Sequence, residues 1–126
     1  MAKTVFITGA SSGIGRALAS ELASRGYDLF LTARRADVLE QARSEIESAH
    51  PGRTVHVREL DVTDDAAVAA ALEQAASALG RVDIVVANAG LELVGKPIAD
   101  ISEIDYDRLF AVNTKGVFFT LQQAAR

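Results

Sequence analysis

The chain has 126 residues, of which 49% are hydrophobic and 24% are charged, and its formal net charge at pH 7 is −4. This length fits one domain, residues 1–126, and the acidic balance without a basic block argues against a nucleic-acid or anionic-membrane surface. The chain has no cysteine, which excludes disulfides, thiolate metal sites and cysteine nucleophiles. Its two histidines, His50 and His56, lack the spacing of metal ligands, so we expect no metal site.

Four short apolar runs, rich in β-branched and aromatic residues, predict strands. In chain order they are residues 4–8 (TVFIT), 28–33 (DLFLTA), 54–60 (TVHVREL) and 82–87 (VDIVVA). After each of the first three, apolar residues recur at helical spacing until a glycine: Ile14 to Leu22 before Gly26, Leu39 to Ala49 before Pro51-Gly52, and Val68 to Leu79 before Gly80. A loop with Gly90, Gly95 and Pro97 follows, and the sequence from Tyr106 onward predicts a helix distorted near Asn113 and Gly116.

This alternation of strands and helices predicts an α/β fold. Short connections between the elements indicate a doubly wound, Rossmann-like parallel sheet with right-handed crossovers and helices on both faces. The start of the chain lacks a signal-peptide hydrophobic region, and no apolar run approaches the ~20 residues of a membrane span. We therefore expect a soluble, cytoplasmic protein that binds no membrane and no nucleic acid.

The stretch TGASSGIG, residues 8–15, joins the first strand to the first helix. In an open α/β sheet, ligands bind beyond the carboxyl ends of the strands, and the N–H groups at a helix start attract anions. Gly9, Gly13 and Gly15 would let a pyrophosphate approach the backbone and let the helix pack closely on the strand. A tight turn without a ligand is the alternative, but the turn's position after the first strand favours a dinucleotide phosphate.

Two arginines, Arg34 and Arg35, follow the second strand, where specificity for the adenine ribose is usually set. An acidic residue there would hold a 2′-hydroxyl, but the first one is Asp37, which we expect inside the next helix. Two arginines suit a 2′-phosphate, so we expect NADP(H) to be preferred, with NAD(H) as the alternative cofactor. The competing interpretation is a solvated arginine pair, which the helix dipole disfavours at a helix start.

Further polar residues end the third and fourth strands. Asp61 is a candidate to accept a hydrogen bond from an adenine amino group, or else it serves the entry to the next helix. Asn88-Ala89-Gly90 ends the fourth strand, where the asparagine amide can tie neighbouring strands together and the glycine admits a ligand. Asn113 is unfavourable in mid-helix and is interpreted as a kink whose freed carbonyl binds water.

Together these residues resemble the short-chain dehydrogenase/reductase family along the whole chain. Residues 8–15 match its Thr-Gly-x-x-x-Gly-x-Gly signature, and the later matches, in order, are Asp61-Val62, Asn88-Ala89-Gly90 and Asn113. Ala87 departs from the pattern, because many members have asparagine there. Ser12 stands where many NADP-dependent members carry a basic residue, whereas Arg34 resembles the family's other NADP determinant.

The resemblance implies strand order 3-2-1-4 and a role for each matching residue. The cofactor phosphates and nearby ribose would contact Gly9, Ser11, Ser12, Gly13, Ile14 and Gly15; the 2′-phosphate would contact Arg34 and Arg35; adenine would contact Asp61 and Val62; and the cofactor groove would contain Asn88, Ala89 and Gly90. Asn113 would be catalytic, because the family asparagine holds a proton-relay water through its backbone carbonyl. The expected reaction is hydride transfer between the nicotinamide and a small carbonyl or alcohol substrate.

Neither of the two tyrosines in these 126 residues belongs to a Tyr-x-x-x-Lys pair, because the residue four positions after Tyr27 is Leu31 and the residue four positions after Tyr106 is Phe110. The resemblance therefore implies a cofactor-binding half that is inactive alone. The alternatives are an inactive dinucleotide-binding module that needs a complementing chain, and a methyltransferase-like domain, which Arg34 and the glycine spacing disfavour. With the fourth strand at an open edge, we expect a homo-oligomer or poor solubility.

Overall fold

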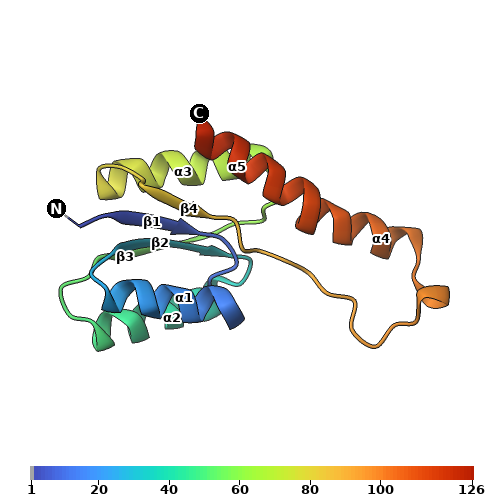
Figure 1. The fold of residues 1–126 in the computed structure, drawn as a ribbon, viewed down its shortest axis with the longest axis horizontal. Helices are drawn as coiled ribbons and strands as arrows, with labels where there is room; N and C mark the ends of the chain where they lie inside the picture. Colours follow the sequence, from blue (N-terminus) through green and yellow to red (C-terminus); the bar gives the residue numbers. More distant parts are fainter. Residues whose placement is uncertain (1) are drawn as a thin grey trace.

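Four parallel strands form one sheet in residues 2–126, the part of the chain that the computed structural model describes (Figure 1). They are β1 (Thr4–Ile7), β2 (Asp28–Ala33), β3 (Val55–Glu59) and β4 (Ile84–Val86). Their order in the sheet is β3-β2-β1-β4, which confirms the predicted topology. The second strand has the predicted bounds, whereas the fourth is shorter than the predicted 82–87.

Two core layers follow from the alternation of side chains along each strand. In β1, Val5 and Ile7 face the helices α1 (Gly13–Ser24) and α2 (Ala36–Ala49), where they pack in one buried cluster. Phe6 points to the opposite face, toward α3 (Asp65–Leu79), and stacks on Phe30 with ring centroids 5.5 Å apart. Figure 1 shows α1 and α2 on one side of the sheet and α3 on the other.

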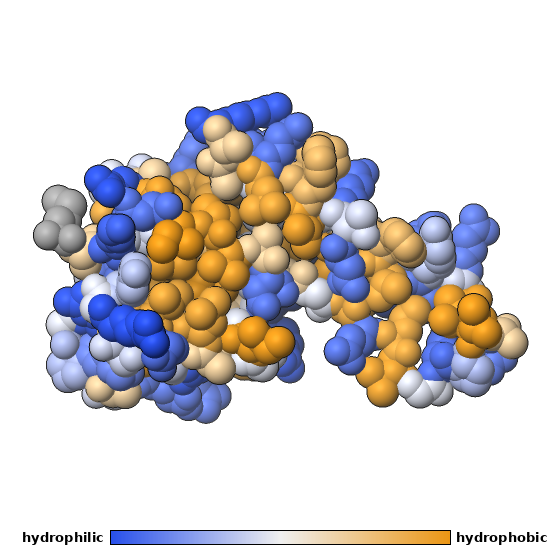
Figure 2. Space-filling view, viewed as in Figure 1, coloured by the Kyte–Doolittle hydropathy of each residue, from blue (hydrophilic) through white to orange (hydrophobic). Residues whose placement is uncertain are grey.

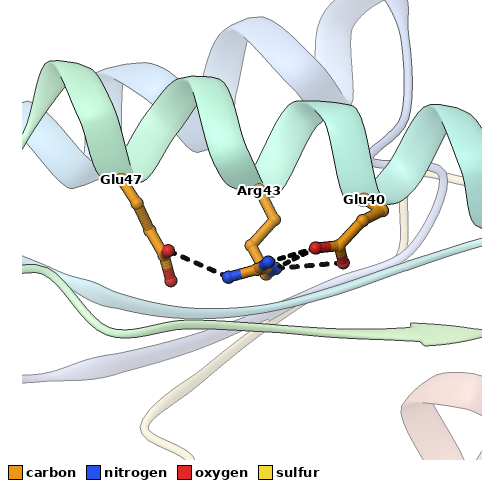
Figure 3. Close-up of polar contacts among 3 residues, drawn as sticks. All are labelled: Glu40, Arg43 and Glu47. Atoms are coloured by element: carbon orange, nitrogen blue, oxygen red, sulfur yellow. Dashed lines mark hydrogen bonds and ion pairs between the residues drawn. The ribbon is translucent and has the colours of Figure 1, made fainter.

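Ion pairs on the outer surface of α2 stabilise that helix. Figure 3 shows Arg43 between Glu40 and Glu47, one helical turn to either side. Its guanidinium donates to Glu47 at 2.9 Å and, through Nε, to Glu40 at 2.9 Å. Exposed pairs at this spacing stabilise a helix only weakly, and here they occupy the charge of Arg43 within its own helix.

The C-terminal helical segment consists of three consecutive parts. These are α4 (Glu103–Phe110), a π-helical stretch η2 (Ala111–Gly116) and α5 (Val117–Ala125), preceded by a short 3-10 turn η1 (Ile98–Asp100). The π-helix confirms the distortion predicted near Asn113 and Gly116. The helix begins three residues before Tyr106, because Ser102 and Asp105 form a capping box that the sequence analysis did not identify.

β4 lies at an open edge of the sheet, as predicted, and Ile84 is 39% exposed there. Figure 2, drawn from the same side as Figure 1, shows apolar surface over the region of β4 and along the arm formed by the following loop and α4. Residues of the arm such as Val94, Ile98 and Ile104 are strongly exposed. None of the helices in residues 2–126 combines the length and the apolar character that a membrane crossing requires.

Candidate functional site

A cleft of about 710 Å³ opens at the carboxyl ends of the strands. Strand ends, the start of α1 and the π-helix bring its walls together. Thirteen of the fourteen predicted site residues lie along it, and Gly15 is the exception; the thirteen are Gly9, Ser11, Ser12, Gly13, Ile14, Arg34, Arg35, Asp61, Val62, Asn88, Ala89, Gly90 and Asn113. The cleft also includes Leu91 and Glu92, which the sequence analysis did not single out.

The turn between β1 and α1 requires glycine at two positions for different reasons. Gly9 has φ +65°, and a Cβ there would lie 2.7 Å from the Cα of Ala89. Gly13 has φ +58°, but no atom lies within 4 Å of where its Cβ would be. Gly9 therefore serves the contact between β1 and the segment after β4, whereas Gly13 leaves bare backbone facing open space.

Gly15 is buried behind the turn and does not reach the cleft wall. A Cβ at this position would lie 2.6 Å from Nδ2 of Asn88 and would also collide with the carbonyl oxygen of Gly9. The third glycine of the signature thus allows α1 to sit directly on the turn. The sequence suggested two roles for these glycines, the approach of a phosphate to the backbone and the close packing of the helix. Gly15 has the packing role in the structure and does not line the cleft.

The first turn of α1 has free backbone N–H groups. Ser12 precedes the helix in an extended conformation, and its side chain forms no cap hydrogen bond. By contrast, Asp64 caps α3 by accepting from the backbone N–H of Ala67 at 3.1 Å. The N–H groups at the start of α1 lack an intrahelical acceptor and lie beside the cleft, where they favour an anion.

Thr8 is a buried residue that joins β1 to the segment after β4. Its hydroxyl oxygen accepts hydrogen bonds from the backbone N–H groups of Asn88 and Ala89, each at 3.0 Å. Asn88 then donates from Nδ2 to the carbonyl oxygen of Gly9 at 3.2 Å, which confirms the predicted tie between strands. In the sequence, Thr8 stands out only as part of the glycine signature, although a threonine that ends a strand beside glycine is a suitable acceptor.

Arg34 and Arg35 follow β2 with exposed side chains, and both line the cleft. Within residues 2–126, neither forms an ion pair, whereas Arg43 has the two carboxylate partners seen in Figure 3. Asp37 lies in the first turn of α2, as predicted, and no acidic residue intervenes between β2 and that helix. The end of β2 therefore offers two guanidinium groups to the cleft.

Asp61 lines the cleft and also organises the approach to α3, which is the second of the two roles that the sequence left open. Its Oδ1 accepts from the backbone N–H of Thr63 at 3.0 Å and from the Thr63 hydroxyl at 2.7 Å. These two hydrogen bonds lower the pKa of the Asp61 carboxyl, partial burial opposes them, and the charge of Arg34 contributes in the same direction as the hydrogen bonds. The helix cap itself is Asp64.

Asn113 lies in the π-helix and holds the loop that follows Asn88-Ala89-Gly90. Its Oδ1 accepts from the backbone N–H of Leu91, and its Nδ2 donates to the carbonyl oxygen of Leu91, both at 2.7 Å. Gly116, at the end of the same π-helix, packs against Val62, because a Cβ there would lie 3.0 Å from a methyl carbon of Val62. The π-helix thus connects two walls of the cleft. Among residues 2–126, no group of three or more histidine, aspartate and glutamate side chains could hold a metal ion.

Comparison with known proteins agrees with this architecture. The family model described as short chain dehydrogenase matches residues 3–126. The L-2,3-butanediol dehydrogenase of Corynebacterium glutamicum is 36% identical over 131 residues, which cover 100% of this chain and 48% of that protein. This chain therefore spans about half the length of the curated relatives that it matches.

Solved structures with similar sequences have the same fold. A double mutant of a Serratia marcescens short-chain dehydrogenase/reductase gives a TM-score of 0.88 at 39% identity, over 98% of this chain and 50% of that one. NAD+-bound xylitol dehydrogenase gives a TM-score of 0.92 at 28% identity, over 98% of this chain and 47% of that one. The chain belongs to the short-chain dehydrogenase/reductase family, a family of oxidoreductases that use nicotinamide cofactors.

Proposed function

We propose that the cleft binds NADP(H), and that residues 1–126 supply the cofactor-binding half of an oxidoreductase acting on a small carbonyl or alcohol substrate. The observation that carries the proposal is the combination of three features along one cleft: bare backbone at Gly13, a start of α1 without a side-chain cap, and two arginines that form no ion pair within residues 2–126. These are donor groups for anions at two separate places, as a dinucleotide with an additional phosphate requires.

The pyrophosphate is assigned to the turn between β1 and α1. Gly13 leaves open space at the backbone, and Ser11, Ser12 and Ile14 line the same wall. The N–H groups of the first helical turn would donate to phosphate oxygens, and the helix dipole would favour their charge. Gly9 and Gly15 would act indirectly, by keeping the turn close to β4 and α1.

Preference for NADP(H) over NAD(H) is assigned to Arg34 and Arg35. A charge-assisted hydrogen bond contributes about 1.5–3 kcal/mol, which corresponds to roughly ten- to hundredfold in affinity. NAD(H) is the alternative, because one similar solved structure, a xylitol dehydrogenase, is described as NAD+-bound. The absence of an acidic residue between β2 and α2 supports the phosphorylated cofactor.

The remaining cleft residues would orient the two ends of the cofactor. Asp61 and Val62 would contact adenine, and Asn88, Ala89 and Gly90 would line the groove between the phosphates and the nicotinamide. When bound, the cofactor supplies a hydride. Asn113 would contribute through its backbone, since its side-chain amide already holds Leu91 and the π-helix changes the partners of nearby carbonyl groups.

The second candidate function is a dinucleotide-binding module without chemistry of its own, complemented by another chain. It is favoured by the absence of a Tyr-x-x-x-Lys pair in these 126 residues, because such a pair would protonate the alkoxide during carbonyl reduction. We expect the chain alone to bind cofactor without turnover. A homo-oligomeric, cytoplasmic protein remains part of the proposal.

The test is a calorimetric titration of the chain with NADPH, NADH and adenosine 2′,5′-bisphosphate. We expect NADPH to bind roughly ten- to hundredfold more tightly than NADH. Arg34→Ala should remove most of that difference, whereas Arg25→Ala, which deletes an equal charge at the far end of α1, should not. Equal affinities for NADPH and NADH would contradict the cofactor assignment, and steady NADPH oxidation with a ketone would contradict the expected inactivity of the chain alone.

A further inference from the structure

The charged residues that line the cleft are divided between its two ends. Arg34 and Arg35 follow β2, Asp61 follows β3, and Glu92 lies in the loop after β4. Because the strand order is β3-β2-β1-β4, Glu92 is separated from the arginines by the end of β1 and its glycine turn. One end of the cleft therefore carries two positive charges and one negative charge, whereas the other end carries a carboxylate alone.

This division defines which half of a bound cofactor meets Glu92. With the 2′-phosphate at Arg34 and the pyrophosphate at the turn after β1, the second nucleoside has to extend past β4. The cleft there is lined by Leu91, Glu92 and Asn113, and among residues 2–126 no lysine or arginine lines that end. The nicotinamide half of the dinucleotide would consequently lie in the field of the Glu92 carboxylate.

The backbone next to Glu92 is fixed to this wall, and within residues 2–126 no cation pairs with the Glu92 carboxylate. Asn113 fixes the adjoining backbone at Leu91 through its two hydrogen bonds of 2.7 Å. The nearby cation on the same loop, Lys96, pairs with Asp105 instead. Within residues 2–126 Glu92 forms no ion pair, so its charge acts on whatever occupies that end of the cleft.

We propose that Glu92 makes the cleft discriminate between the two redox forms of its cofactor. With Glu92 present, the affinity for NADP+ relative to that for NADPH is higher than it would be with a neutral residue at this position. This inference rests on the proposed function. The oxidised nicotinamide ring carries a positive charge, and addition of a hydride neutralises it. A carboxylate beside the ring therefore stabilises the oxidised form and leaves the reduced form nearly unaffected.

The exposure of Glu92 limits the size of this effect. Two charges near a protein surface and separated by several ångströms interact through a high effective dielectric constant, and salt screens them further. We expect Glu92→Gln to raise the ratio of the Kd of NADP+ to the Kd of NADPH by about two- to fivefold at low salt. Glu92→Lys should raise the ratio further, because it replaces attraction with repulsion.

The experiment measures three dissociation constants by calorimetry for each variant, those of NADP+, NADPH and adenosine 2′,5′-bisphosphate. The bisphosphate lacks the nicotinamide half, so its affinity should stay constant in Glu92→Gln if the residue acts on the ring. Glu73→Gln is the matched control, because Glu73 is an exposed carboxylate on α3 outside this cleft. Circular dichroism confirms that each variant folds.

The outcomes separate this inference from the function on which it rests. The inference is supported if Glu92→Gln raises the ratio of the Kd of NADP+ to the Kd of NADPH. This increase should become smaller at high salt and should not occur in Glu73→Gln. An unchanged ratio with normal binding of both forms would overturn it and leave the proposed function intact. An equal loss for all three ligands would also overturn it, since Glu92 would then shape the cleft as a whole. Failure of the unaltered chain to bind any of the three would overturn the proposed function, and this inference with it.

Discussion

Replacing Gly15 with alanine tests the contact that seats α1 on the glycine turn. The added Cβ would lie 2.6 Å from Nδ2 of Asn88 and would collide with the carbonyl oxygen of Gly9. Cβ contacts under 3.0 Å essentially never occur, and the Gly9 carbonyl is backbone that already accepts a hydrogen bond from Asn88. The variant therefore has to shift α1 or open the turn.

Opposing effects determine the size of the change in the free energy of unfolding. Overpacking in a close contact costs about 1–3 kcal/mol, and loss of the Asn88 to Gly9 hydrogen bond costs about 1 kcal/mol more. Alanine in place of glycine within a helix returns up to about 1 kcal/mol. We expect Gly15→Ala to lower the free energy of unfolding by about 1–3 kcal/mol, which corresponds to a fall of several degrees in Tm.

Urea denaturation followed by circular dichroism measures this difference. The matched control is Gly90→Ala, because a Cβ at Gly90 would lie 3.6 Å from Oδ1 of Asn113, which is an ordinary contact. The control should retain nearly the stability of the unaltered chain. If Gly15→Ala proves as stable as Gly90→Ala, the close approach of α1 to the turn does not constrain this position and the packing role assigned to Gly15 is wrong.

Three further expectations concern the same elements. Thr8→Val should lower the free energy of unfolding by about 1–3 kcal/mol, because it removes the shared acceptor of two backbone N–H groups. Thr32→Val loses a single hydrogen bond to Ile7 and should therefore lower it by less. Equal urea midpoints for the two variants would contradict this reasoning. Folding lowers the pKa of Asp61 from its ordinary 3.8, so the ionised carboxylate contributes to the free energy of unfolding at neutral pH, and this contribution is lost as the pH falls below about 4 through the lowered value. Asp61→Asn should therefore lose less stability than the unaltered chain between pH 6 and pH 3. An identical loss in both proteins would argue against this role. Ile84→Lys should shift the chain toward monomer in sizing with multi-angle scattering, because it places a charge on the open edge of β4, whereas a monomeric unaltered chain would show that the edge does not self-associate.

The sequence was sufficient for the fold and for most of the cleft, because both depend on local patterns. Residues 28–33 form a mainly apolar run that begins with an aspartate and is followed by two arginines, and the strand has those bounds. The cleft residues were predictable because parallel strands bring their carboxyl ends to one edge of the sheet. The distortion at Asn113 was predictable from an asparagine and a glycine inside an otherwise helical pattern.

Other features depended on contacts that no local pattern carries. The fourth strand is shorter than its apolar run: the Asp83 carboxylate accepts from the backbone N–H of Thr4 at 2.8 Å, and the paired register with β1 runs only from Ile84 to Val86. The packing role of Gly15 depends on the position of Asn88, which is distant in sequence. Glu92 lies in a loop without periodicity, and only its place along the cleft distinguishes it from other exposed carboxylates.

The bonds that hold β4 also determine the order in which the sheet can assemble. Thr4 and Thr8, at the two ends of β1, hold residues 83, 88 and 89 through hydrogen bonds that span 79 to 81 residues of sequence. The contacts among β1, β2 and β3 close much shorter loops, and the entropy lost on closing a loop grows with its length. We therefore expect the first three strands to fold as a nucleus and β4 to dock last, so that the cleft is completed only in the final step of folding.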